Sequence, residues 1–202
     1  DGPDLKVEVD GKLFTRYATT GSKRPHMYPV IGANGAALTR TYPIANKEDH
    51  PHHSSLWFAH GTVNGIDFWL DGEKSGTIKH TGFSDVKVEG SSGSFVARAS
   101  WQKPGGGEVL NDERLITITA LPEGVRQIDF TITLNAGSQD VTLEDTKEGS
   151  MAIRVVPSMS IKEGTGHILT SAGSKDKKAW GTRADWVSFY GPDGKGEPAC
   201  IT

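Results

Sequence analysis

The stretch that decides the fold is Ile116-Thr-Ile-Thr-Ala-Leu-Pro-Glu-Gly-Val-Arg-Gln-Ile-Asp-Phe-Thr-Ile-Thr-Leu134. Apolar and polar side chains alternate in residues 116–120 and again in residues 128–134, as they do in half-buried antiparallel strands. Between these parts, Leu121-Pro-Glu-Gly124 is typical of a turn, because proline fixes φ and glycine accepts a positive φ. The two parts are therefore predicted to pair as a β-hairpin.

The same alternation continues on both sides of the hairpin. It runs from Phe95 to Trp101, and after the Pro104–Gly107 break a further strand is expected from Glu108 to Arg114. No segment has a helical stripe longer than about three turns. Strands at this spacing predict an all-β fold, an antiparallel β-sandwich. Further strands are expected at Leu5–Val9, Leu13–Tyr17, Ala37–Tyr42, Ile66–Leu70, Val86–Glu89 and Met151–Val156.

Length and composition limit the classes of protein. The 202 residues suffice for one domain with a core, so residues 1–202 are interpreted as a single β-sandwich domain. A formal charge of -3 without Lys or Arg clusters argues against a nucleic-acid partner. No apolar run approaches the roughly 20 residues of a membrane span, so membrane insertion is not expected. The single cysteine, Cys200, excludes an intrachain disulfide and a thiolate metal cage.

Four of the seven histidines fall in one short segment, which makes it the first candidate for a functional site. They are His50, His52, His53 and His60. Imidazoles near neutral pH bind metals, transfer protons or hydrogen-bond to sugar hydroxyls, and the sequence does not choose between these roles. His50, His52 and His60 are the metal candidates, although their spacing matches no stringent zinc signature. A hydrogen-bonded turn with no chemical role is the structural alternative.

The conformation expected for this segment is extended. His50 precedes Pro51, which favours β or polyproline geometry at His50. In such a strand His50 and His52 share one side and His53 points to the other. At most two or three of the rings are then expected to meet at one point.

Aromatic side chains flank the histidines. Trp57, Phe58, Phe68 and Trp69 lie on either side of a predicted turn, Asn64–Asp67. Aromatic faces beside hydrogen-bonding groups suit carbohydrate rings, whose C–H patches stack while their hydroxyls bind fixed partners. For each aromatic taken singly, an ordinary place in the core is the alternative.

Two further polar segments join the candidates. Glu144-Asp-Thr-Lys-Glu-Gly149 precedes Arg154, which stands among apolar residues and is expected to need a carboxylate partner. Such a carboxylate, Glu144 or Asp145, is a candidate acid or base, although acidic loops are usually solvated. In Trp180–Trp186, two tryptophans bracket Arg183 and Asp185, as in a sugar-binding wall or in a structural Arg–Trp stack.

Six segments of the chain form a recognisable set. They are Tyr28-Pro-Val-Ile-Gly-Ala-Asn-Gly35, Thr39-Arg-Thr-Tyr-Pro43, Asp49-His-Pro-His-His53, Leu56-Trp-Phe-Ala-His-Gly61, Asn64-Gly-Ile-Asp-Phe-Trp69 and Asp145-Thr-Lys-Glu-Gly149. Together they resemble the bacterial family catalogued as methane oxygenase PmoA, or PmoA-like, and the resemblance runs from about Leu5 to the end of the chain. The family name is misleading, because a methane monooxygenase subunit needs transmembrane helices that this sequence lacks.

The resemblance carries its own expectations. Members look like exported proteins of polysaccharide-degrading bacteria, which implies a periplasmic or extracellular location, with no signal peptide in this chain. Their pattern is similar to the supersandwich of sugar mutarotases. They usually continue into a further His- and Pro-containing stretch, so the sandwich is expected to lack its C-terminal part.

The preferred hypothesis is a carbohydrate-active enzyme, a hydrolase or lyase on a glycoside and less readily an epimerase. The alternatives are a non-catalytic carbohydrate-binding module and a metal-binding β-sandwich domain. The sequence identifies no cofactor, sugar or oligomeric state, and a divalent metal is not favoured. The catalytic candidates are His50, His52, His53, His60, Glu144 and Asp145. The substrate-binding candidates are Arg40, Tyr42, Trp57, Asp67, Trp69, Lys147, Arg154, Trp180, Asp185 and Trp186.

Overall fold

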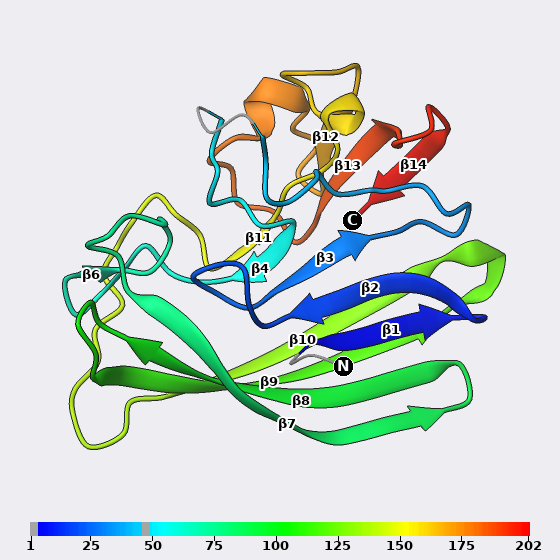
Figure 1. Ribbon diagram of the computed structural model, residues 1–202. Helices are drawn as coiled ribbons and strands as arrows, with labels where there is room; N and C mark the ends of the chain where they lie inside the picture. Colours follow the sequence, from blue (N-terminus) through cyan, green and yellow to red (C-terminus); the bar gives the residue numbers. More distant parts are fainter. Residues whose placement is uncertain (1–3, 46–48) are drawn as a thin grey trace.

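The computed structural model describes residues 4–45 and 49–202, and its sheets are antiparallel throughout (Figure 1). Within those residues the only helical elements are three short 3₁₀ turns, η1 (Pro122–Gly124), η2 (Pro157–Met159) and η3 (Asp176–Ala179). A five-stranded sheet has the order β1 (Leu5–Val9), β2 (Lys12–Ala18), β3 (His26–Val30), β4 (Leu56–Phe58), β11 (Met151–Ile153). A four-stranded sheet has the order β10 (Arg126–Asn135), β9 (Glu108–Ala120), β8 (Ser92–Gln102), β7 (Thr77–Glu89).

These two sheets form the predicted β-sandwich. Figure 1 shows the blue strands β1 to β3 lying over the green sheet β7 to β10. Aromatic and aliphatic side chains fill the space between the sheets, and burying them stabilises the fold by about 25 cal/mol per Å² of apolar surface. The sandwich core consists of Phe14, Tyr17, Met27, Val30, Leu56, Phe95, Ala97, Ile116 and Ile118.

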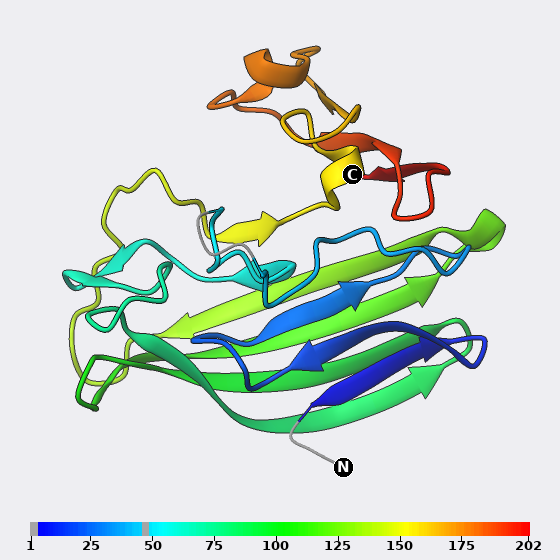
Figure 2. The same ribbon diagram turned by 45° about the horizontal axis from the view of Figure 1, so that its top comes forward.

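Two smaller sheets complete the fold. A ribbon of β5 (Thr62–Val63) and β6 (Ile66–Asp67) turns at Asn64-Gly65, whose φ values of +49° and +75° suit a two-residue hairpin turn, as predicted. The third sheet comprises β12 (His167–Thr170), β13 (Val187–Pro192) and β14 (Pro198–Ile201). In Figure 2 this orange and red sheet stands away from the two large sheets.

The hairpin that decided the fold is confirmed. Strands β9 and β10 pair in register, with Ile118 opposite Ile128 and Ile116 opposite Phe130. The connection is η1, in which Glu123 and Gly124 have φ values of +59° and +77°. Strand β9 is longer than expected, because the segments around Arg114 and Ile116 form one continuous strand.

The strand expected at Ala37–Tyr42 is wrong. This segment makes only isolated bridges, Ala37 with Ile31 and Thr39 with Val155. Its polar groups bind three different neighbours. The Thr39 hydroxyl accepts hydrogen bonds from the Val30 N–H and from the Ser55 hydroxyl, and the Arg40 N–H donates to the Arg154 carbonyl. A segment shared among several partners forms no continuous ladder.

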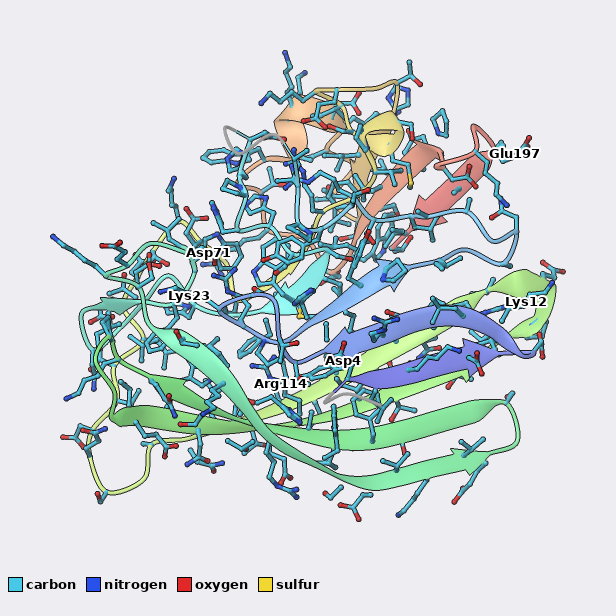
Figure 3. The ribbon with its side chains drawn as sticks, in the orientation of Figure 1. Asp4, Lys12, Lys23, Asp71, Arg114 and Glu197 are labelled. Atoms are coloured by element: carbon cyan, nitrogen blue, oxygen red, sulfur yellow. The ribbon has the colours of Figure 1, made fainter. Side chains whose placement is uncertain are left out.

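One ion pair lies inside the sandwich. Arg114 and Asp112 sit two residues apart on β9, with 2% and 0% of their side chains exposed, and Figure 3 labels Arg114 between the large sheets. The Arg114 Nε and Nη2 donate to the two Asp112 carboxylate oxygens at 2.8 and 2.7 Å. The Trp101 indole N–H donates to the same carboxylate at 2.6 Å. The Asp112 carboxylate thus accepts three hydrogen bonds from buried donors, two from Arg114 and one from Trp101. We therefore assign this buried pair a structural role.

No helix in the described part of the chain has the length and apolar character that crossing a bilayer requires.

Candidate functional site

The segment Asp49–His53, called here the histidine loop, is a tight turn that gathers three imidazole rings. The His53 N–H donates to the His50 carbonyl at 3.0 Å, and His50 has a φ of +46°. The ring centroid of His53 lies 4.7 Å from that of His50 and 4.6 Å from that of His52. The expected extended conformation, with His53 on the opposite side, is wrong because the turn reverses the chain between His50 and His53.

Two buried arginines hold the loop by its carbonyl groups. Arg40 donates to the carbonyls of Asp49 and His50 at 3.1 and 2.9 Å. Arg24 donates to the His52 carbonyl at 2.8 Å and also pairs with Asp71, which Figure 3 labels. Only 1% of Arg24 and 4% of Arg40 is exposed, so both anchors belong to the protein interior. These contacts fix a turn in which a non-glycine residue keeps a positive φ.

Asp49 links the loop to a more distant arginine. Its Oδ2 accepts from Arg40 at 2.7 Å and from Arg154 at 2.9 Å, and Arg154 also binds Glu163 at 3.1 Å. The hydrogen bond from His50 and the charges of the two arginines hold the pKa of the Asp49 carboxyl well below its usual value. The expectation that Arg154 needs a carboxylate partner is confirmed, although the partners are Asp49 and Glu163 rather than Glu144 or Asp145.

The carboxylate of Asp49 also fixes the tautomer of His50. Its Oδ1 lies 2.8 Å from His50 Nδ1 and, as an ionised oxygen, can only accept. The proton of the neutral ring is therefore on Nδ1, and Nε2 is left with a lone pair. Because 52% of the His50 side chain is exposed, this lone pair is accessible from solvent.

Two tryptophans form the floor beneath His53. The His53 ring centroid lies 5.1 Å from Trp57 and 6.3 Å from Trp69. Both tryptophans are buried, and neither indole N–H has an acceptor within the described residues. Burial, followed by the neighbouring His52 and His50, lowers the pKa of His53 to about 3. His53 is therefore uncharged at neutral pH and can accept a hydrogen bond.

His60 lies at the end of β4 and takes no part in these ring contacts. Its Nε2 lies 2.9 Å from the Glu144 carbonyl oxygen, and its Nδ1 lies 3.3 Å from the Ser150 hydroxyl. The Glu144 carboxylate accepts from the Gly65 N–H at 2.8 Å. His60 and Glu144 are thus brought together, but through the backbone of Glu144. Each ring nitrogen of His60 already has a hydrogen-bonding partner. His60 therefore does not join His50 and His52 in the metal site that the sequence suggested.

The segment that includes Asp145 and Lys147 lies beside this contact. Both side chains are exposed, and Lys147 pairs with Glu148 at 3.2 Å. Burial and the charge of Arg24 lower the pKa of His52, whereas the charge of Glu148 acts in the opposite direction.

The remaining candidates take other positions. Asp67 accepts from the backbone N–H groups of Trp69 and Leu70 at 2.9 and 2.7 Å, which makes it a local cap. Tyr42 packs edge-on against the buried His26, with centroids 4.9 Å apart. Both contacts account for these side chains without a substrate.

The Trp180–Trp186 segment lies elsewhere on the molecule. It follows η3, which stands apart from the cyan strand β4 when Figures 1 and 2 are compared. Trp180 is 87% exposed and borders an apolar pocket of about 520 Å³, while Trp186 is 45% exposed. The backbone N–H of Asp185 donates to Ser171 at 2.8 Å. A single site containing these residues and the histidine loop is therefore not formed.

Within the described ranges, no group of three His, Cys, Asp or Glu side chains is placed to hold a metal ion. The three rings of the histidine loop contact one another mainly through their faces and edges. Stacked rings direct their nitrogens along different lines, whereas a metal needs lone pairs that converge at about 2 Å.

Arg24, Asp71 and Glu163 contact the histidine loop or its anchors, and the sequence did not suggest them. They lie 9 to 47 residues along the chain from the groups that they contact. Only the fold brings them to the site.

Comparison with known proteins gives one match. The family model described as "Family of unknown function (DUF6807)" matches residues 4–202. The chain belongs to this family. No curated protein and no solved structure matches the chain. The resemblance to PmoA-like proteins stays a prediction, as does the supersandwich type of the fold.

Proposed function

We propose that the protein is a carbohydrate-active enzyme that acts on a glycoside at the histidine loop, by elimination rather than by hydrolysis. The observation that supports this most directly is the uncharged His53 ring, held between His50 and His52 and close to two arginines. The ring is uncharged at neutral pH, but burial makes it a weak base, so proton removal depends on arginines that stabilise the negative charge left on the substrate. Elimination from a sugar acid begins with the removal of the proton next to its carboxylate.

The charges around His53 suit such a substrate. Arg154 keeps 21% of its side chain exposed and reaches the loop from the position directly after β11. A guanidinium beside a substrate carboxylate stabilises the negative charge that develops when the neighbouring proton leaves. The exposed His50 ring, whose Nε2 carries a lone pair, offers a further hydrogen-bonding partner. These features favour a uronate over a neutral sugar.

The carboxyl groups argue against ordinary glycoside hydrolysis. That reaction uses a pair of carboxyl groups, one of which keeps its proton at neutral pH through a raised pKa. Every described carboxyl pKa that departs from its usual value is lowered, as at Asp49. Asp49 is ionised and held by arginines, so it is a poor proton donor.

Incubation with uronate-containing and neutral polysaccharides tests the proposal. Elimination gives an unsaturated product that absorbs in the ultraviolet, whereas hydrolysis gives only new reducing ends. His53→Gln should lower the rate on the order of 10²–10⁴-fold, because it removes the base. His167→Gln is the matched control, since His167 is an exposed histidine on β12. Reducing ends without ultraviolet absorption, or an unchanged rate in His53→Gln, would contradict the proposal.

A non-catalytic carbohydrate-binding role has one observation in its favour, the exposed Trp180 beside an apolar pocket. Exposed indole faces stack on sugar rings. Glycan binding that is lost in Trp180→Ala, without turnover by the unmodified protein, would support this second role. Trp57 and Trp69 are too deeply buried to provide such a platform.

A further inference from the structure

We infer that Ser150 and His60 form a second reactive site, separate from the histidine loop, in which Ser150 is the nucleophile and a carboxylic ester is the substrate. This site is independent of the proposed action on glycosides. It draws on contacts between the residues that follow β4, Ser150 just before β11, and the segment Glu144–Gly149.

The contacts of His60 determine its tautomer. The Glu144 carbonyl oxygen, 2.9 Å from Nε2, can only accept a hydrogen bond, so Nε2 carries the proton of the neutral ring. Nδ1 then has a free lone pair, and it faces the Ser150 hydroxyl at 3.3 Å. The Ser150 O–H is therefore the donor in that contact. A hydroxyl that donates to an oriented imidazole is the arrangement that activates serine nucleophiles.

The orientation of His60 is firmly held. Ala59 donates from its N–H to the Ser150 carbonyl at 2.9 Å, and Glu144 donates from its N–H to the Thr62 carbonyl at 3.0 Å. These bonds fix both ends of the segment between Glu144 and Ser150 against the chain that contains His60. Thr146 fills the space that a side chain at Gly61 would need, with Oγ1 only 2.6 Å from the position of an ideal Cβ. The segment thus packs closely over the residue after His60.

Backbone N–H groups without an acceptor among the described residues lie beside Ser150. Among contacts inside the described part of the chain, none of the backbone N–H groups of residues 145–150 has an acceptor. These include the N–H of Ser150 itself, and the N–H of the nucleophile is a usual member of an oxyanion hole. Gly149, which precedes Ser150, is exposed, and Ser150 itself is half-buried.

The proposed reaction transfers the acyl group of the ester first to Ser150 and then to water. Ser150 Oγ forms a bond to the ester carbonyl carbon, and its proton moves to His60 Nδ1. The bond between that carbon and the alkoxy oxygen breaks, and the same proton passes to the departing alcohol. Water then attacks the acyl-serine, giving up a proton through His60 to Ser150 Oγ. The products are one carboxylic acid and one alcohol.

The orienting group points to esters rather than amides. In serine proteases a carboxylate stabilises the imidazolium that forms during attack. Here a neutral carbonyl takes that position, so the imidazolium is less stabilised. A substrate with a good leaving group, such as an alcohol from an ester, makes the smaller demand on the base.

A fluorophosphonate probe and 4-nitrophenyl acetate test the inference on the full chain. The probe should phosphonylate Ser150 with loss of fluoride, as located by peptide mass spectrometry, and the ester should be hydrolysed. Ser150→Ala should lose both reactions, and His60→Gln should slow them on the order of 10²–10⁴-fold. Ser158→Ala is the matched control, because the Ser158 hydroxyl only donates to the Asp193 carbonyl.

The outcomes are separable from those of the proposed glycoside activity. Folding of each variant is checked by thermal unfolding, and Ser150→Ala, which removes one oxygen, keeps the test valid even where His60→Gln unfolds. Glycoside turnover should be unchanged in Ser150→Ala. Absence of labelling in the folded unmodified protein, or equal labelling and ester hydrolysis in Ser150→Ala, would overturn the inference.

Discussion

Two groups of arginine and aspartate side chains in this protein have similar chemistry and opposite surroundings. Arg114 and Asp112 lie between the large sheets, with 2% and 0% of their side chains exposed. Asp49, which binds Arg40 and Arg154, is 19% exposed and shares the surface with His50. The interior pair is closed to any ligand, whereas the charges at the histidine loop remain in reach of one. Ion pairing alone therefore does not mark a functional site, and accessibility separates the two cases.

The largest effect is expected for the interior pair. Asp112→Asn leaves the Arg114 charge buried without a counter-ion and should lower the free energy of unfolding by about 3–5 kcal/mol. Chemical denaturation measures the change. Glu113→Gln, next to it on β9, breaks only an exposed pair with Arg98 and should cost at most about 1 kcal/mol. Equal costs for the two variants would contradict the distinction between interior and surface pairs.

A smaller effect is expected at the histidine loop. Asp49→Asn should lower the free energy of unfolding by about 1–3 kcal/mol, because Arg40 keeps two carbonyl acceptors and Arg154 keeps Glu163. The same denaturation experiment applies, with Glu163→Gln as the control that leaves Asp49 in place. A cost as large as that of Asp112→Asn would show that water does not reach the loop.

These two regions also differ in how far the sequence predicted them. The alternation in residues 116–134 predicted the hairpin, because turn and strand signals are local. Asp112 and Arg114 lie two residues apart on β9 and are both buried there, but their pairing was not among the predictions. The contact between Asp49 and Arg154 joins residues 105 positions apart, and no local pattern carries it.

The conformation of the histidine loop could not be predicted from the sequence. The cluster of histidines was visible, but its conformation was not, because His50 adopts a positive φ that its own preferences disfavour. Arg24 and Arg40 stabilise that turn through carbonyl groups from positions 10 to 28 residues away. Tertiary contacts thus overrode the local preference before Pro51.

Acid should weaken the fold through its histidines before its carboxylates. The pKa of His53 is lowered from 6.5 to about 3, and those of His26, His52 and His80 are also lowered by burial. Below pH 6.5 the unfolded chain takes up protons that the folded chain does not, so the free energy of unfolding falls as the pH falls toward 3.

Melting temperatures from pH 7 to pH 4.5 measure this loss. The lower limit avoids the range where Asp49, with its lowered pKa, begins to lose its own stabilising charge. His53→Gln should lose less melting temperature over this range than the unmodified protein, by ~2–4 °C, the equivalent of ~1 kcal/mol for a chain of this size. His167→Gln, at an exposed position, should follow the unmodified protein. A parallel pH dependence in His53→Gln would contradict the lowered pKa of His53.

The smallest effect on stability is expected for His50→Ala. The His50 side chain is 52% exposed, and the turn is held by arginines that bind carbonyl groups, which alanine retains. The free energy of unfolding should change by no more than about 0.5 kcal/mol, as in His167→Ala, where another exposed histidine–aspartate contact is removed. The pKa of Asp49, followed by NMR, should rise, because the hydrogen bond from His50 is the main cause of its lowering. A loss above about 1.5 kcal/mol would show that the His50 side chain itself holds the turn. The histidine loop would then contribute to stability more like the buried Arg114–Asp112 pair than its exposure indicates.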